Sequence, residues 1–206
     1  MDELFTIVKP NESTMKLDNI TKLKLFPNLE YKKNVLIMEA NRWKNICQLD
    51  LGPIQKTKLF KPVFSEEKMY DNNNELVGIV DRVHKCYSYD PFAPNHSEFK
   101  DGDLVIVENK TGTYTKKKAI SYEEELLWYR ILLRESKGVD IRWGAIYFPK
   151  GNQVHFVDLN EDKFNEQLLL DRINKIREKI NNKVFLPIPS EYCNNCFHWD
   201  ICEYRK

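Results

Sequence analysis

The stretch LVIVENKTG, Leu104–Gly112, is an apolar run that ends in two charged residues separated by one position. Consecutive apolar residues rich in Val and Ile predict a buried β-strand over residues 104–110. Residues two apart on a strand project to the same face, so Glu108 and Lys110 are expected to emerge together. A carboxylate and an ammonium at the end of such a strand are unfavourable to bury without a partner or a task. The end of this strand is therefore the first candidate site.

A second apolar run, ELVGIVDRV over Glu75–Val83, carries Asp81 near its end. If the two strands pair, Asp81 and Glu108 converge on one hard divalent cation, because Mg²⁺ and Mn²⁺ prefer oxygen ligands. The carbonyl of Asn109 would complete the protein ligands. Lys110 would then stand near a metal-bound water and either lower its pKa or accept its proton. This chemistry is directed at a phosphodiester; the plain alternative is a surface ion pair between Glu108 and Lys110.

The flanking sequence predicts an α/β or α+β domain with a mixed sheet and helices packed on it. Periodicity predicts helices over residues 35–47, 121–136 and 162–181, strands over 76–84 and 104–110, and a hairpin over 143–159 that turns at 149–152. Polar turns are expected at residues 71–74 and 101–103. Ser121 is the expected N-cap of the second helix, with Glu124 three positions later. The apolar face of the first helix is predicted to comprise Leu36, Ala40, Trp43 and Cys47.

Length and charge fit one globular domain. The 206 residues carry a formal charge of +1, which argues against a polycation or an acidic disordered tail. Within a single domain 1–206 we distinguish an N-terminal helical region (1–60), the strands with the acidic residues (61–113), a helix–hairpin–helix region (114–182) and a Cys-rich tail (183–206). No apolar run approaches the roughly 18 residues of a membrane span, and the start lacks a signal-peptide pattern. We expect a cytoplasmic protein with no membrane partner.

Three cysteines lie close together near the end of the sequence, at Cys193, Cys196 and Cys202. Their polar surroundings are unlike those of cysteines buried in a core. Three thiolates can bind Zn²⁺ or an iron–sulfur cluster, and a fourth ligand must then come from elsewhere. Cys47 and Cys86 are the candidates, and His198 would suit zinc. Buried free thiols are the alternative.

The order of these motifs resembles that of the PD-(D/E)XK nucleases of the RecB type, and its layout is most similar to the CRISPR-associated iron–sulfur exonuclease family. The resemblance covers about residues 35–206 and includes FLPIPSEYC at Phe185–Cys193, before the tail. It implies a restriction-endonuclease-like core with the tail packed on the N-terminal helical region. It also implies a Mg²⁺- or Mn²⁺-dependent nuclease of single-stranded DNA, an exonuclease with endonuclease activity open, and Asp81, Glu108 and Lys110 as its catalytic set.

The same resemblance assigns further residues. Glu39 occupies the place of an acid on an early helix, and Glu125 with Tyr129 occupies that of a DNA-orienting Gln-x3-Tyr pair. A 4Fe-4S cluster would be held by Cys193, Cys196, Cys202 and Cys47. The family's first cysteine usually precedes the early-helix acid, whereas no cysteine precedes Glu39 here. An altered cluster, zinc in its place, or loss of the cluster therefore stay open.

Basic residues after the second strand are candidates for phosphate contacts. Lys116, Lys117 and Lys118 fall in a predicted loop, for which a solvated loop without function is the alternative, and Arg130 follows Tyr129 directly. The expected partners are single-stranded DNA and proteins of recombination, repair or CRISPR adaptation, with the oligomeric state open. Two other functions remain: a non-catalytic nucleic-acid-binding module folded around zinc, and an iron–sulfur redox protein.

Overall fold

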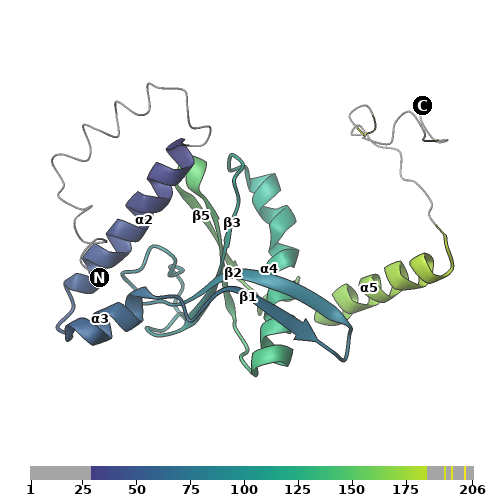
Figure 1. The fold of residues 1–206 in the computed structure, drawn as a ribbon, viewed down its shortest axis with the longest axis horizontal. Coiled ribbons are helices and arrows are strands. Elements are labelled where there is room, and N and C mark those ends of the chain that lie inside the picture. The colour runs from purple at the N-terminus through teal and green to yellow at the C-terminus, as the bar shows by residue number, and fades with distance from the viewer. Residues whose placement is uncertain (1–28, 185–192, 194–195, 197–201, 203–206) are drawn as a thin grey trace. The chain divides into compact units, whose positions relative to one another are not determined.

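A computed structural model describes residues 29–184 together with Cys193, Cys196 and Cys202 (Figure 1). The chain divides into two compact units, Met1–Phe164 and Asn165–Lys206, and each is described by itself. None of the helices in the described residues has the length and apolar character that a membrane span requires.

The first unit is built on one five-stranded mixed sheet. Its strands follow the chain order as β1 (Phe64–Asp71), β2 (Leu76–Lys85), β3 (Leu104–Asn109), β4 (Trp143–Phe148) and β5 (Gln153–Asp158). Neighbouring strands are antiparallel except β3 and β4, which are parallel and joined by a helical crossover. The predicted α+β class with a mixed sheet is confirmed.

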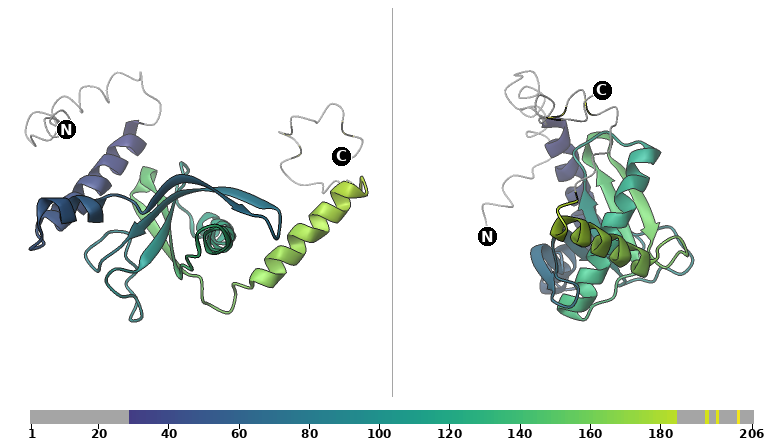
Figure 2. Two further views of the ribbon diagram at one scale, coloured as in Figure 1. Left: turned by 60° about the horizontal axis from the view of Figure 1, so that its bottom comes forward. Right: turned by 90° about the vertical axis from the view of Figure 1, so that its right-hand side faces the viewer.

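Helix α4 (Lys116–Lys137) is the crossover and covers one face of the sheet (Figure 2). Two strand positions that face it are glycines, and a Cβ at Gly78 or Gly144 would lie 2.5 or 2.6 Å from a leucine Cδ1 of the helix. A larger residue at either position would push the helix away from the sheet. The two glycines therefore set how closely α4 approaches the strands.

Helix α2 (Leu29–Cys47) covers the opposite face, followed by the short α3 (Pro53–Phe60). Met38, Arg42 and Ile46 are its buried positions, whereas Leu36 is 64% exposed and Cys47 is exposed. The predicted apolar face of this helix is therefore wrong. The periodicity was misleading because Arg42 is buried, where it pairs with Asp90, Nε to Oδ2 at 2.8 Å.

Other boundaries differ from those predicted. Helix α4 begins five residues before Ser121, because the Thr115 side chain caps it by accepting from the Lys118 N–H at 3.2 Å. Strand β1 and helix α3 were not predicted. The 149–152 turn is present as the 3₁₀ turn η1 (Pro149–Gly151), and the polar 71–74 turn joins β1 to β2.

The described residues of the second unit are mainly helix α5 (Glu166–Asn181), which begins after Asn165, whose side chain accepts from the Leu168 N–H at 3.1 Å. The predicted helix over 162–181 is thus present with a later start. Apart from its three cysteines, the tail from residue 185 lies outside the described residues. Its lead-in at 185–192, His198 and its predicted packing on the N-terminal region stay predictions.

Candidate active site

Strands β2 and β3 bring two of the predicted acidic residues together. They pair with Arg82 opposite Val107, and continuing this antiparallel register by one residue sets Asp81 opposite Glu108. Opposed residues of an antiparallel pair project to the same face. The Asn109 backbone N–H donates to Asp81 Oδ2 at 3.0 Å and holds this carboxylate at the end of β3. The two strands thus pair, which is the condition on which the convergence of Asp81 and Glu108 was predicted.

The side chain of Asp81 lies on the sheet face that α4 covers, because the alternation of side chains along β2 shifts by one position next to Asp81. A side chain at Gly78 would collide with α4, so position 78 faces α4. Arg82 bonds to Glu39 of α2 and therefore lies on the opposite face. In a regular strand, positions four apart would share a face. Opposite Asp81, the ladder with β1 is interrupted at Glu66, whose φ of 50° lies in the left-handed region. A non-glycine residue in this conformation is strained by about 1–2 kcal/mol. Local strain thus accompanies the placement of Asp81.

Glu108 is a buried carboxylate whose surroundings perturb its ionisation. Its side chain is 7% exposed, and its Oε1 accepts from Lys110 Nζ at 2.9 Å. The other oxygen, Oε2, is shielded from solvent and has no hydrogen-bond partner within the described residues. Burial raises the pKa of Glu108 to about 7, with the negative charge of Asp81 adding to the rise and the hydrogen bond from Lys110 opposing it. A buried carboxylate oxygen without a partner suits a cation.

Lys110 is held by more than Glu108. Its Nζ also donates to Glu125 Oε2 of α4 at 2.5 Å and lies 4.4 Å from the centroid of the Tyr122 ring. Burial alone would lower the pKa of Lys110, but the hydrogen bonds to Glu125 and Glu108 raise it above its ordinary value. Tyr129 is buried, and its hydroxyl donates to Glu125 Oε1 at 3.1 Å. Glu125 and Tyr129 thus lie beside Lys110.

Glu39 lies on α2 and contacts two arginines. Its Oε2 accepts from Arg42 at 3.2 Å and its Oε1 accepts from Arg82. Arg82 Nη2 in turn donates to Asn109 Oδ1 at 3.1 Å. The described hydrogen bonds of Glu39 therefore join it to Asn109 through Arg82, and none of them joins it directly to Asp81 or Glu108.

The predicted phosphate contacts have different surroundings. Lys116–Lys118 are exposed and form the first turn of α4 rather than a loop, so the expectation of a loop is wrong. A helix N-terminus with added lysines attracts anions. Arg130 instead pairs with Asp140 at 2.7 and 3.0 Å and donates to the Leu159 carbonyl at 2.8 Å, so these bonds hold its guanidinium in the fold.

The cysteines differ in exposure. Cys193 is half-buried and its carbonyl accepts from the Cys196 N–H at 3.0 Å, which makes a tight turn between two predicted ligands, and Cys202 is half-buried. Cys47 is exposed at the end of α2, whereas Cys86 is fully buried. Burial raises the pKa of the Cys86 thiol, and a metal ligand must be a thiolate. Of the two candidate fourth ligands, Cys47 has the more suitable surroundings.

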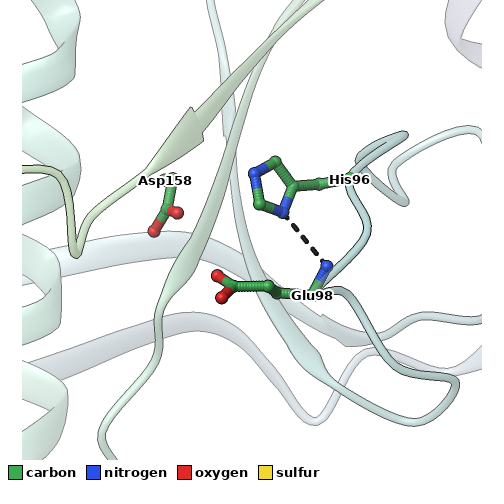
Figure 3. Close-up of side chains that lie close together, drawn as sticks. All are labelled: His96, Glu98 and Asp158. Atoms are coloured by element: carbon green, nitrogen blue, oxygen red, sulfur yellow. Dashed lines mark hydrogen bonds between the residues drawn. The ribbon is translucent and has the colours of Figure 1, made fainter.

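A second group with ligand chemistry lies near the start of β4, away from Glu108. Ligand atoms of His96, Glu98 and Asp158 lie within 4.8 Å of one another (Figure 3). Arg142 pairs with both carboxylates, with Nη2 2.6 Å from Asp158 Oδ2, and His96 Nδ1 accepts from the Glu98 N–H at 3.2 Å. These carboxylates already have a cationic partner, and hydrogen bonding from Arg142 lowers the pKa of Asp158. The group is better described as an ion-pair network.

Sequence reasoning did not single out the contact of Tyr122 with Lys110 or the bonds of Arg82 to Glu39 and Asn109. The signal for Tyr122 was present, since it lies three residues before Glu125 on the same helix. Its use required the position of α4 relative to Lys110, which no local pattern gives. No comparable pattern marks Arg82, because its partners come from two other elements.

Comparison with known proteins agrees with this arrangement. No curated protein matches the chain. Residues 24–203, which include both paired strands, α4 and most of the tail, match the family description "PD-(D/E)XK nuclease superfamily". Nucleases of this superfamily use divalent metals, and the buried Glu108 oxygen opposite Asp81 provides oxygen ligands of the kind that Mg²⁺ prefers. On this match over most of its length, the chain belongs to the PD-(D/E)XK nuclease superfamily.

Proposed function

We propose that this nuclease hydrolyses single-stranded DNA at a site made by Asp81, Glu108 and Lys110, with Mg²⁺ or Mn²⁺ as its cofactor. The observation that carries the proposal is Glu108 Oε2, which has no hydrogen-bond partner among the described residues and is buried next to a lysine and opposite a second carboxylate. Asp81, Glu108 and the carbonyl of Asn109 would hold the metal. When bound, the metal polarises the phosphodiester and supplies a nucleophile near neutral pH.

The protein residues have separate tasks in this proposal. Asp81 is oriented by the Asn109 N–H, which keeps one of its oxygens fixed. The two carboxylate neighbours of Lys110 keep it in the ammonium form, and its charge would stabilise negative charge on the phosphate. Lys116–Lys118, at the exposed N-terminus of α4, would attract the phosphate backbone of the strand.

The finer assignment to the RecB type rests on the order of motifs in the chain. Gly78 and Asp81 lie on one strand, Glu108 lies on the next with Lys110 directly after it, and Tyr129 lies on the following helix. We propose that Cys193, Cys196, Cys202 and Cys47 bind a 4Fe-4S cluster, with Zn²⁺ as the alternative at this site. The exposure of Cys47 and the turn at Cys193 support this set. Anaerobically purified protein should then show visible absorbance, whereas a zinc protein would be colourless.

The activity is tested with linear, end-blocked and circular single-stranded DNA in Mn²⁺. We expect cleavage by the wild type and loss of cleavage in Asp81→Ala and Lys110→Ala, with the folded state checked by circular dichroism. Cleavage of the linear strand alone would establish an exonuclease, and cleavage of the circle an endonuclease. Glu98→Gln, in the other acidic group, is the matched control and should keep full activity. Full activity of either site variant would refute the assignment.

A further inference from the structure

Among the described residues, Glu108 and two residues of α4 contact the ammonium of Lys110. Nζ lies 2.9 Å from Glu108 Oε1, 2.5 Å from Glu125 Oε2 and 4.4 Å from the Tyr122 ring centroid. An ammonium has three donors, and the face of an aromatic ring within about 6 Å attracts a cation. Tyr122 and Glu125 are three positions apart, so they lie on the same side of the helix.

Both α4 residues are themselves fixed. The two oxygens of Glu125 are divided between Lys110 and the buried Tyr129 hydroxyl. The Tyr122 ring packs at 6.4 Å from the ring of Phe148, which is fully buried in β4. Since the glycines of β2 and β4 allow α4 to lie close to the sheet, the two side chains keep their positions relative to the end of β3, which Lys110 directly follows.

This arrangement matters when a cation binds to Glu108. A carboxylate that coordinates a divalent ion attracts an ammonium much less, so Glu108 alone would release Lys110 as the metal binds. Glu125 and Tyr122 do not depend on that carboxylate. A carboxylate at position 125 would repel a phosphate but pairs well with a lysine, which favours this task over a direct contact with DNA.

We propose that Glu125 and Tyr122 are positioning residues that keep the Lys110 ammonium beside the scissile phosphate while Glu108 is bound to the metal. The proposal rests on the proposed function, because it takes Glu108 as a metal ligand. It assigns Tyr122 a role in the reaction through its aromatic face, and it gives Glu125 an electrostatic task through Lys110.

The first test follows the Lys110 ammonium directly by ¹H–¹⁵N NMR of the full chain, with and without Mg²⁺. The signal is assigned by its absence from Lys110→Met. We expect a protected, ring-shifted ammonium signal in the wild type under both conditions, because exchange with water is slow for a held ammonium. In Glu125→Leu the signal should disappear when Mg²⁺ is added. In Tyr122→Leu the ring shift should be lost, and in Tyr122→Phe it should be kept.

The second test measures cleavage of a single-stranded oligonucleotide. Tyr122→Leu should lower kcat about fivefold and Glu125→Leu about tenfold or more, with KM changed less than about twofold, because the substrate does not touch either residue. Tyr122→Phe should restore the rate. Tyr114→Leu is the matched control, since Tyr114 packs on the same Phe148 ring, 5.3 Å away, without a described contact to Lys110.

The outcomes separate the two proposals. Loss of the Lys110 signal in the wild type on adding Mg²⁺, or an unchanged shift and rate in Tyr122→Leu, would overturn the positioning role even if the wild type cleaves DNA. A wild type that cleaves no nucleic acid but shows the expected NMR behaviour would instead refute the proposed function, while the holding of the Lys110 ammonium by Glu125 and Tyr122 would stand.

Discussion

His84 makes the stability of this fold depend on pH in a way that can be measured. Its ring is 1% exposed, stacks on Phe92 with centroids 5.8 Å apart, and has no hydrogen-bond partner for either nitrogen within the described residues. Burial lowers the pKa of His84 to about 2, and the nearby charges of Arg42 and Arg82 contribute in the same direction. The folded protein therefore holds a neutral imidazole across the range in which an unfolded chain takes up a proton.

The sign and size of the effect follow from this difference. Below pH 6.5 the unfolded state binds a proton that the folded state does not, so the free energy of unfolding falls as the pH falls toward 2. Each pH unit in this window lowers it by about 1.4 kcal/mol. Between pH 7 and pH 5 the contribution of His84 alone is about 2 kcal/mol.

The substitution His84→Leu removes the titrating group and keeps a similar apolar volume. Because two buried nitrogens without partners are also removed, the variant should be at least as stable as the wild type at pH 7. Urea unfolding followed by circular dichroism at pH 7, 6 and 5 gives both free energies. The wild type and the variant share all other titrating groups, so the contributions of those groups cancel in the difference between the two free energies of unfolding. We expect the gap between the two proteins to widen by about 2 kcal/mol; a gap that stays constant would refute the account of His84.

Three further outcomes follow from other contacts. Gly78→Ala should lower the free energy of unfolding by about 1–3 kcal/mol in urea, because its Cβ would lie 2.5 Å from a leucine of α4; an unchanged value would contradict the close packing. Arg42→Leu should lower it by about 3–5 kcal/mol by leaving Asp90 buried without its cation, and the double variant with Asp90→Leu should recover some of the loss, which thermal unfolding can measure. Mg²⁺ should raise the Tm of the wild type and of Glu98→Gln but not of Glu108→Gln; the reverse pattern would move the metal to the other acidic group.

The sheet could be predicted in part because its central strands are apolar. The segments 76–80 and 104–107 contain no polar side chain, and both strands are observed within one residue of the predicted bounds. Strand β1 escaped prediction because FSEEKMYD places charged residues where its pairing with β2 is interrupted at Glu66. A strand of this composition is stabilised by its neighbour rather than by an apolar pattern of its own.

Helix α2 shows why the orientation of an element is harder to predict than its presence. A pattern of apolar residues placed Leu36 and Cys47 inward, yet the buried stripe runs through Arg42. Its guanidinium packs between Phe60 and Phe92, at 5.5 and 5.8 Å, and pairs with an acid from outside the helix. These partners are distant in sequence, so the periodicity of the helix does not reveal them.

The candidate site was partly predictable because two of its residues are close together in the sequence. The spacing of Glu108 and Lys110 fixes their common face on any strand, and the pairing of two apolar runs then brings Asp81 opposite Glu108. Tyr122 and the unpartnered Glu108 Oε2 depend on where α4 lies against the sheet, which no local pattern states.

Asn109 is the point at which the two faces of the sheet are connected. Its backbone N–H donates to Asp81 on the α4 side, while its side-chain oxygen accepts from Arg82 on the α2 side. Arg82 in turn donates to Glu39, so three successive hydrogen bonds join Glu39 to Asp81. Metal binding by Glu39 would weaken its ion pairs with Arg42 and Arg82, both largely buried. Within the described residues the hydrogen bonds of Glu39 thus reach the acidic site through Arg82 and Asn109, from the face that α2 covers, and a catalytic Glu39 stays a prediction.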